Sequence, residues 1–427
     1  MSASERFRRL SWEGFWVVLG QLAAVSGSLI GVRLLTELLD PATYGELTLC
    51  MTMATLVNQT VLGPLGNGIA RFYAPAQEQG DIGSYLRASS RLVLIASLVI
   101  GIAMVVTIAG LKIASLAGWI AVTCAALVFA VLSGWSSVVS SIQGAARQRS
   151  VVALHQGLES WLRFLLAAAL LMWWGPRSAI ALTGYVLALL IVLASQYFFL
   201  GKLAIAGESV PESAQRWQTR IWSFSWPISI FGIFTWMQLA SDRWALVLFS
   251  TTQEVGLYAV LFQLGYYPIS LVSGMVVSFL APIFYQRSGD ASDAGRNADV
   301  NRMSWKIAWW SLAFTLGAFL AAFFFHALLF QLFVAAEYRV VSGLFPWVIL
   351  AGGVFAASQS LSLGLMSQMK TRNMMSAKIV TAIVGVLLNL AGAHWFGIAG
   401  IVYAGVVFSI LFFSWILLVF RSEALSS

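Results

Sequence analysis

The fold of this chain is constrained most strongly by a succession of twelve apolar segments, each long enough for a helix to cross a bilayer. Such a helix needs about 20 consecutive, mostly apolar residues. The segments lie at residues 12–39, 44–65, 86–111, 116–142, 151–174, 178–200, 224–249, 256–284, 304–328, 343–366, 374–395 and 398–420. The sequence therefore predicts an all-α polytopic membrane protein with about twelve transmembrane helices.

The charged residues between these segments predict how the chain is oriented. Only 10% of the residues are charged, against about 25% in soluble domains. About nineteen Lys and Arg residues fall on the side of the two termini, and only Lys112, Arg177 and Arg339 fall on the other side. Because basic residues concentrate in cytoplasmic loops, we expect both termini to be cytoplasmic. The net charge of +8 is spread among these loops, so it does not indicate nucleic-acid binding.

The two halves of the sequence resemble one another. A shift of about 211 residues sets Arg33 near Arg243 and TYGEL (residues 43–47) on EVGLY (residues 254–258). An even number of segments separates the copies, so two parallel six-helix lobes are expected around a central cleft, where such transporters bind their substrates. We expect the N-terminal lobe at residues 1–202, a cytoplasmic linker at 203–221 and the C-terminal lobe at 222–427.

Arg33, Arg163 and Arg243 lie well inside apolar segments, where an ionisable side chain costs several kcal/mol unless it pairs or faces water. Arg33 and Arg243 stand at equivalent places of the repeat, and Arg163 lies near the middle of the fifth segment. Guanidinium groups bind phosphate bidentately. The three arginines are therefore candidates for an anion site, and the alternative is that they only form ion pairs that hold helices together.

Each of these arginines has an acid close by in the sequence. Glu37 follows Arg33 by four residues and Glu159 precedes Arg163 by four, which places each pair on one helix face. Asp242 adjoins Arg243 and should point about 100° away from it, so at least one of the two is expected to reach another helix or the cavity. Asp242, Glu159 and Glu37 are also candidate cavity acids, and Asp242 or Glu159 could couple transport to a proton or sodium gradient.

The cysteines and histidines do not form a metal-binding pattern. Cys50 and Cys124 lie in apolar segments, and His155, His326 and His394 lie in three different segments without neighbouring ligands. We expect no metal and no cofactor.

Several motifs occur in an order that resembles a known family. They are RLLTELLDPATYGELTL at residues 33–49, LGPLGNGIARFY at 62–73, SDR and EVGLY at 241–258, AEYRVVSGLFP at 336–346 and WFGIAGIVYA at 395–404. In this order they resemble the polysaccharide flippases of the multidrug/oligosaccharidyl-lipid/polysaccharide superfamily. Arg33, Asp242 and Arg243 stand at matching motif positions.

The resemblance implies a non-enzymatic, multi-pass transporter of the bacterial cytoplasmic (inner) membrane. Its cargo would be a polyprenyl-pyrophosphate-linked oligosaccharide for O-antigen, capsule or exopolysaccharide, moved from the cytoplasmic to the outer leaflet. Polysaccharide polymerase and glycosyltransferases would be its partners, beside the lipid bilayer. The polar residues Gln21, Asn58, Gln59 and Gln238 are candidates for sugar contacts.

Two other functions stay open at this point. A cation-coupled multidrug exporter of the same superfamily would favour acids without matched arginines, because typical drugs are cationic. A membrane enzyme that acts on lipid-linked sugars normally carries a large external loop with catalytic residues. The external loops expected here are short, the longest lying near residues 331–342, which disfavours the enzyme.

Overall fold

The structure is a computed structural model that describes residues 3–201, 211–289, 293–368 and 371–425. All regular structure in these residues is helical, as the sequence predicts. By their contacts the helices divide into two compact units, Met1–Trp236 and Met237–Ser427. The boundary lies inside one long helix, α8 (Pro211–Phe249). Each unit is described by itself.

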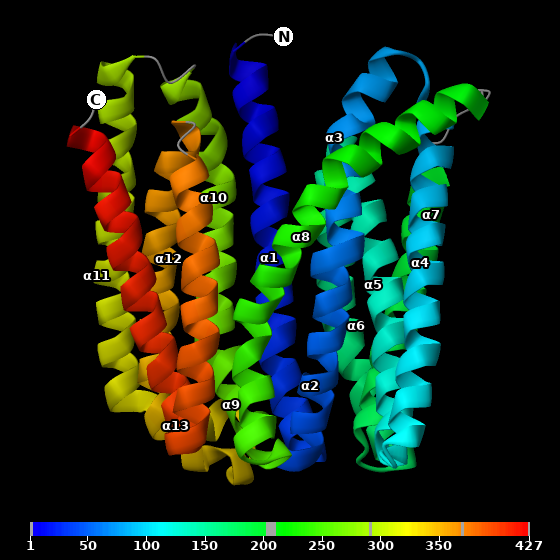
Figure 1. Ribbon diagram of the computed structural model, residues 1–427, viewed down its shortest axis with the longest axis vertical. Coiled ribbons are helices and arrows are strands. Elements are labelled where there is room, and N and C mark those ends of the chain that lie inside the picture. Colours follow the sequence, from blue (N-terminus) through cyan, green and yellow to red (C-terminus); the bar gives the residue numbers. More distant parts are fainter. Residues whose placement is uncertain (1–2, 202–210, 290–292, 369–370, 426–427) are drawn as a thin grey trace. The chain divides into compact units, whose positions relative to one another are not determined.

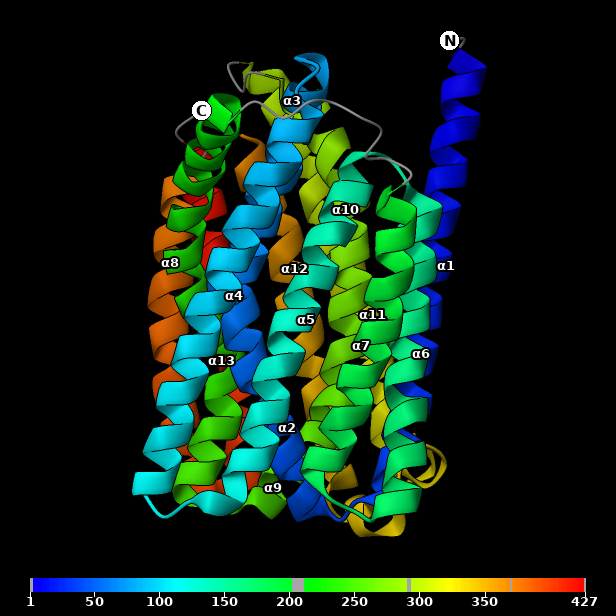
Figure 2. The same ribbon diagram turned by 90° about the vertical axis from the view of Figure 1, so that its right-hand side faces the viewer.

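The first unit consists of long helices that lie side by side (Figures 1 and 2). Its elements are α1 (Ala3–Leu38), α2 (Pro41–Val57), the π-helix η1 (Asn58–Leu62), α3 (Gly63–Glu78), α4 (Ile82–Ile113), the 3-10 helix η2 (Ala117–Trp119), α5 (Ile120–Ala145), α6 (Arg149–Trp174), α7 (Ser178–Gly201) and the first part of α8. The end of α3 and the starts of α4 and α8 meet at one end of this unit (Figure 1).

The second unit repeats the same kinds of element. It contains the rest of α8, α9 (Thr252–Leu261), the π-helix η3 (Phe262–Tyr266), α10 (Tyr267–Ser288), α11 (Ala294–Phe333), the 3-10 helix η4 (Ala336–Leu344), α12 (Phe345–Ser367) and α13 (Thr371–Leu425). Helix α13 is two helices joined at Gly397, whose backbone (φ 56°, ψ −135°) breaks the helical path. These two parts correspond to the predicted segments 374–395 and 398–420.

Hydropathy and helix length support the prediction of a membrane protein. Eight segments among the described residues are long and apolar enough to cross a membrane. The predicted segment 44–65 is longer than expected, because α2, η1 and α3 form a continuous helical path to Glu78. The total of twelve spans and the side on which the termini lie stay predictions.

A π-helical turn interrupts the second helical path of each unit. In both turns a proline follows, Pro64 after η1 and Pro268 after η3. Proline has no N–H, and its ring pushes against the carbonyl four residues earlier. The backbone N–H of the residue before proline therefore donates to the carbonyl five residues earlier instead of four. Accordingly, the N–H of Gly63 donates to the Asn58 carbonyl and that of Tyr267 to the Phe262 carbonyl. Each unit thus has a turn of this kind, but the shift between the two turns is 204 residues, against 211 for TYGEL and EVGLY, so they do not occupy matching positions of the repeat.

Small residues let α1 approach α6 closely in the first unit. A Cβ at Gly20 would lie 2.9 Å from the Cβ of Ala153, and a Cβ at Gly31 would overlap the ring of Phe164. The Ser160 hydroxyl donates to the Ala24 carbonyl at 2.9 Å. Close packing and interhelical hydrogen bonds are what hold helices together in a bilayer, where lipid is as apolar as the side chains.

The start of α8 is fastened to the first unit. The indole of Trp217 is fully buried and its Nε1 donates to Oδ2 of Asp81 (2.7 Å), which also accepts from the Ser213 hydroxyl. Residues 203–210 of the predicted linker lie outside the described residues, and residues 211–221 are the first turns of α8. The predicted division into residues 1–202, 203–221 and 222–427 stays a prediction.

Replacing Asp81 with Asn should destabilise the protein in a pH-dependent way. Partial burial acts to raise the pKa of the Asp81 carboxyl, but hydrogen bonds from neighbours including Ser213 and Trp217 outweigh it, so the pKa lies below its ordinary value. A lowered folded-state pKa gives stability that is present above the unfolded pKa of about 3.9 and is lost as the pH falls through the folded value. In thermal unfolding in detergent, Asp81→Asn should lose about 1 kcal/mol at pH 7 and progressively less below about pH 4.

The matched control is Glu78→Gln, an exposed carboxylate of the same end that makes no hydrogen bond to the described residues. It should leave the unfolding midpoint unchanged across this pH range. A constant difference between native protein and Asp81→Asn from pH 3 to pH 8 would contradict the assignment.

Candidate functional site

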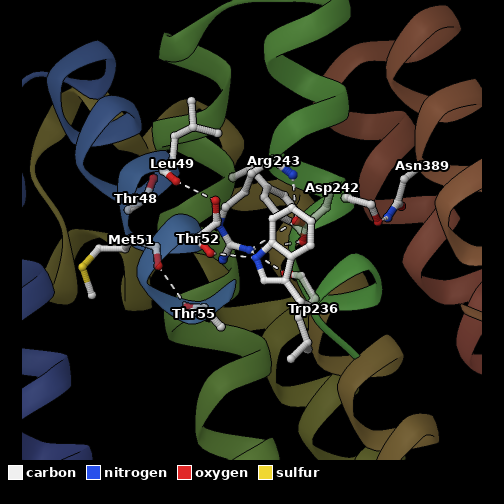
Figure 3. A network of polar contacts seen from close by, with 12 residues as sticks. Thr48, Leu49, Met51, Thr52, Thr55, Trp236, Asp242, Arg243 and Asn389 are labelled. Carbon is white, nitrogen blue, oxygen red and sulfur yellow. Dashed lines mark hydrogen bonds and ion pairs between the residues drawn. The ribbon is translucent and has the colours of Figure 1, made fainter. Parts of the chain in front are cut away.

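The second unit buries an acid and a base that are adjacent in the sequence. Asp242 is 6% exposed, and Nη1 of Arg243 lies 3.2 Å from its Oδ1 (Figure 3). The same Nη1 donates to the Leu239 carbonyl at 3.2 Å. Although adjacent side chains point about 100° apart, the two also pair with one another, because the long Arg243 side chain folds back along the helix onto its neighbour.

Asp242 also reaches a second helix, as expected. The hydroxyl of Tyr258 on α9 donates to its Oδ2 at 2.8 Å. The Arg243 guanidinium carbon lies 4.6 Å from the ring centre of Phe262 and 5.7 Å from that of Tyr258. Aromatic faces attract a guanidinium, more strongly where water is excluded. Arg243 is therefore held by one carboxylate and two rings.

A small cavity of about 70 Å³ lies beside this pair in the second unit. Its polar lining includes Gln238, Asp242, Tyr258 and Asn389. Asn389 on α13 donates from Nδ2 to the Ser241 hydroxyl at 2.8 Å (Figure 3). A water needs about 10–15 Å³ of such space and several polar partners. The cavity is therefore large enough for a few waters or a small cation next to a carboxylate.

Glu254 explains a further part of the EVGLY motif. Its Oε2 accepts from the backbone N–H of Ile398, the residue that follows the break at Gly397. A carboxylate at the start of a helix satisfies a free N–H and suits the positive end of the helix dipole. In the first unit, Oε2 of Glu46 on α2 accepts from the side-chain hydroxyl of Ser178, the first residue of α7, at 2.9 Å. This pairing of elements is a structural trace of the repeat.

The arginines of the first unit have different surroundings. Arg33 pairs with Glu37, and their side chains are 36% and 49% exposed. The Arg163 guanidinium carbon lies 4.8 Å from the ring centre of Phe164 and 5.3 Å from that of Tyr185. Its Nε is buried without a hydrogen-bond partner among the described residues. The ion pair between Glu159 and Arg163 that their spacing allows is not formed in the structure, so Glu159 is available for another role.

Glu159 lines a polar cavity that the sequence did not reveal. This cavity of about 260 Å³ lies between α5, α6 and α7 and adjoins a second one of about 470 Å³ that shares Ser137 and Ser140. The polar lining of the two consists of Ser133, Ser136, Ser137, Ser140, Ser141, Arg149, His155, Gln156, Glu159 and Gln196. The signal was the run SSVVSS at residues 136–141, whose serines lie one turn apart on α5. Hydroxyls and amides at this density suit a hydroxyl-rich ligand.

The four candidate sugar residues are dispersed. Asn58 of η1 donates from Nδ2 to the Ser133 hydroxyl at 2.8 Å, which places it beside the serine-lined cavity. Gln21 has a buried Oε1 without a hydrogen-bond partner among the described residues. The Gln59 carbonyl packs against Gly232 of α8, and Gln238 lines the cavity of the second unit. Arg33 and Arg243 belong to different units, so their meeting in one anion site stays a prediction.

Comparison with known proteins gives the family. Residues 12–287, well over half of the chain, match the polysaccharide biosynthesis protein family. The chain belongs to this family. Its sequence finds no match among curated proteins.

Solved structures show the fold of this member of the polysaccharide biosynthesis protein family. It is similar to the lipid II flippase MurJ in an inward closed conformation, with 10% identity and a TM-score of 0.70 over 96% of this chain and 87% of that one. It is also similar to the Vibrio cholerae MATE transporter VcmN (13% identity, TM-score 0.64, 99% and 98% covered). An outward-facing multidrug resistance MATE transporter of the MOP superfamily gives 15% identity and a TM-score of 0.62 over 97% of each chain. These findings confirm the predicted family and an all-helical membrane fold like that of MurJ and MATE transporters, and they support a transporter rather than an enzyme.

Proposed function

We propose that the protein moves a polyprenyl-pyrophosphate-linked oligosaccharide from the cytoplasmic to the outer leaflet of the bacterial inner membrane, by alternating access between its two units. The glycan would be destined for O-antigen, capsule or exopolysaccharide. Membership of the polysaccharide biosynthesis protein family and the fold shared with a lipid II flippase support this proposal.

The observation that carries the proposal is the state of the intramembrane arginines. Arg243 is only 11% exposed and is held by Asp242 together with two aromatic rings, while Arg163 keeps a buried N–H without an acceptor in the described part of the chain. A pyrophosphate offers the oxygens that such guanidinium groups bind best. Asp242 competes with that anion for Arg243, so the site can release its cargo. The serine-lined cavity supplies hydroxyls for the sugars.

Energy for transport would come from an ion gradient, since no cofactor is expected. Asp242 borders the small cavity of the second unit and Glu159 borders the polar cavity of the first. Either carboxylate could take up a proton or a sodium ion. The second candidate function, a cation-coupled drug exporter, is favoured by the MATE-like fold and by these same acids. A drug exporter with cationic cargo would, however, give the arginines no ligand.

The test is translocation of a labelled lipid-pyrophosphate oligosaccharide in proteoliposomes, with and without imposed proton or sodium gradients. Arg33→Ala and Arg243→Ala should each slow flipping about 10- to 100-fold, because a hydrogen bond to a charged group is worth about 1.5–3 kcal/mol. The double variant should show no flipping. Arg243→Lys, which keeps a charge beside Asp242 but loses the planar fork, should fall between native protein and Arg243→Ala.

Lys112→Ala, which removes an exposed cation at the end of α4, is the matched control and should flip at the native rate. Each variant is first checked for a monodisperse, folded state. Normal flipping by a folded double variant would show that these arginines are structural. Transport of cationic drugs together with no flipping by the native chain would favour the exporter.

A further inference from the structure

A groove on the flank of the first unit is separate from the sites described above. It runs between α4 and α8 and is closed behind by η1 and α3, with a volume of about 780 Å³. This is within the range of pockets that hold drug-sized or lipid-sized ligands. Neither the candidate anion site nor the serine-lined cavity shares a residue with it.

The groove changes from polar to apolar along its length. On α4 its lining residues include Arg91, Ile95 and Val99, which are four residues apart and therefore share one helix face. On α8 the lining begins with Gln215 and Gln218 and continues to Trp222. Because Asp81 fastens the starts of α4 and α8 together, the polar ends of the two helices coincide. One end of the groove is basic and hydrogen-bonding, and the rest is mostly hydrocarbon, interrupted by the hydroxyls of Thr60, Thr219 and Ser229.

Arg91 is the charged group at the polar end. It is exposed and forms no hydrogen bond or ion pair with any residue that the structure describes. No carboxylate lines the groove to neutralise it. It lies about nine residues, or roughly 14 Å, into the span Ile82–Ile113, a depth at which an arginine reaches the headgroup layer. An anion at the membrane surface is therefore the expected partner of Arg91.

The apolar part faces the bilayer. Ile95 is 45% exposed, Val99 56% and Trp222 54%, although each lines the groove. In a membrane, hydrocarbon chains cover such side chains. A free phosphate would leave this wall uncovered, and a neutral lipid would leave Arg91 without a partner. Only an anionic amphiphile matches both ends.

We propose that this groove binds an anionic glycerophospholipid of the surrounding bilayer. Its phosphate would lie at Arg91 with the amides of Gln215 and Gln218 as further donors, and one acyl chain would lie along Ile95 and Val99 against Trp222. The lipid lies beside the part of α8 that runs from Trp217, bonded to Asp81, to Gly232, packed on the backbone of η1, a part that α3 also contacts at Gly68. It therefore stiffens the helix that continues into the second unit. The proposal does not depend on the cargo.

The test is native mass spectrometry of the full chain in micelles that contain equal amounts of phosphatidylglycerol and phosphatidylcholine. The native protein should retain phosphatidylglycerol preferentially. Arg91→Gln should weaken this binding about tenfold or more, the loss of a bidentate charge-assisted contact. Arg87→Gln is the matched control: Arg87 is exposed one turn earlier on α4 and does not line the groove. It makes the same change in net charge and should keep binding within about twofold.

A second variant separates the tail from the headgroup. Val99→Trp fills the apolar part from an exposed position, so it should fold and yet lose phosphatidylglycerol while Arg91 is intact. Equal binding by Arg91→Gln and native protein would overturn the proposal, as would equal losses in Arg91→Gln and Arg87→Gln.

Two competing ligands test whether the groove prefers another molecule that carries a phosphate. Inorganic phosphate at millimolar concentration should not displace the lipid, and displacement would identify a simple anion site. Polyprenyl phosphate at the concentration of phosphatidylglycerol should leave the bound lipid in place. Its displacement of the lipid would assign the groove to the tail of a polyprenyl lipid instead.

Discussion

Replacing Asp242 with Leu should lower the free energy of unfolding by about 3–5 kcal/mol, the cost of leaving a buried charge without its partner. The variant keeps the Arg243 guanidinium, 11% exposed in the structure, within the predicted membrane segment 224–249. It also removes the acceptor of the Tyr258 hydroxyl. We expect little monodisperse protein after purification and a much lower midpoint in thermal unfolding in detergent.

The control is the double variant Asp242→Leu/Arg243→Leu. Removing both charges removes the cost of holding them inside the membrane, so most of the lost stability should return. The double variant should nevertheless fail in the flipping assay, which separates the role of the pair in folding from its role in transport. A double variant no more stable than the single one would show that Arg243 is not stabilised by Asp242.

The fold was predictable because it depends on properties that can be read directly from the sequence. Apolar length and the rarity of charge specify membrane helices. The likeness of TYGEL to EVGLY predicted the repeat, and the structure adds that Glu46 and Glu254 join corresponding pairs of helices, α2 with α7 and α9 with the second part of α13. The π-helical turns were not predicted, because they depend on how a proline displaces the turn before it and hydropathy does not register this.

The candidate site was predictable only in part. The angle of about 100° between adjacent side chains predicted that at least one of Asp242 and Arg243 reaches another helix or the cavity, and Asp242 does so at Tyr258. That Arg243 could still pair with Asp242 depends on the rotamer of a long side chain, which spacing does not determine. The serine-lined cavity was missed because serines on a helix are as compatible with packing as with a cavity. Arg33 belongs to the first unit and Arg243 to the second, so their meeting in one anion site stays a prediction.

Replacing Gly184 of α7 with Ala should destabilise the protein by about 1–3 kcal/mol, and Gly184→Leu should prevent folding. A Cβ at this position would lie 2.5 Å from both Cα and N of Ala167 on α6. These are backbone atoms of a fully buried residue, so only separation of the two helices makes room. In a bilayer, where close packing is the main attraction between helices, that separation is costly. Folded yield and thermal unfolding in detergent measure the effect.

The matched control, Gly101→Ala on α4, has the opposite expected sign. Nothing lies within 4 Å of a Cβ there, and Ala is favoured over Gly inside a helix by up to about 1 kcal/mol. Gly400 of the second unit, which a shift of about 216 residues aligns with Gly184, approaches the backbone of Gly392 in the same way. Gly400→Ala should therefore destabilise the protein as Gly184→Ala does. If Gly184→Ala lowered the stability and Gly400→Ala did not, the repeat would preserve the order of the helices without preserving how closely they pack.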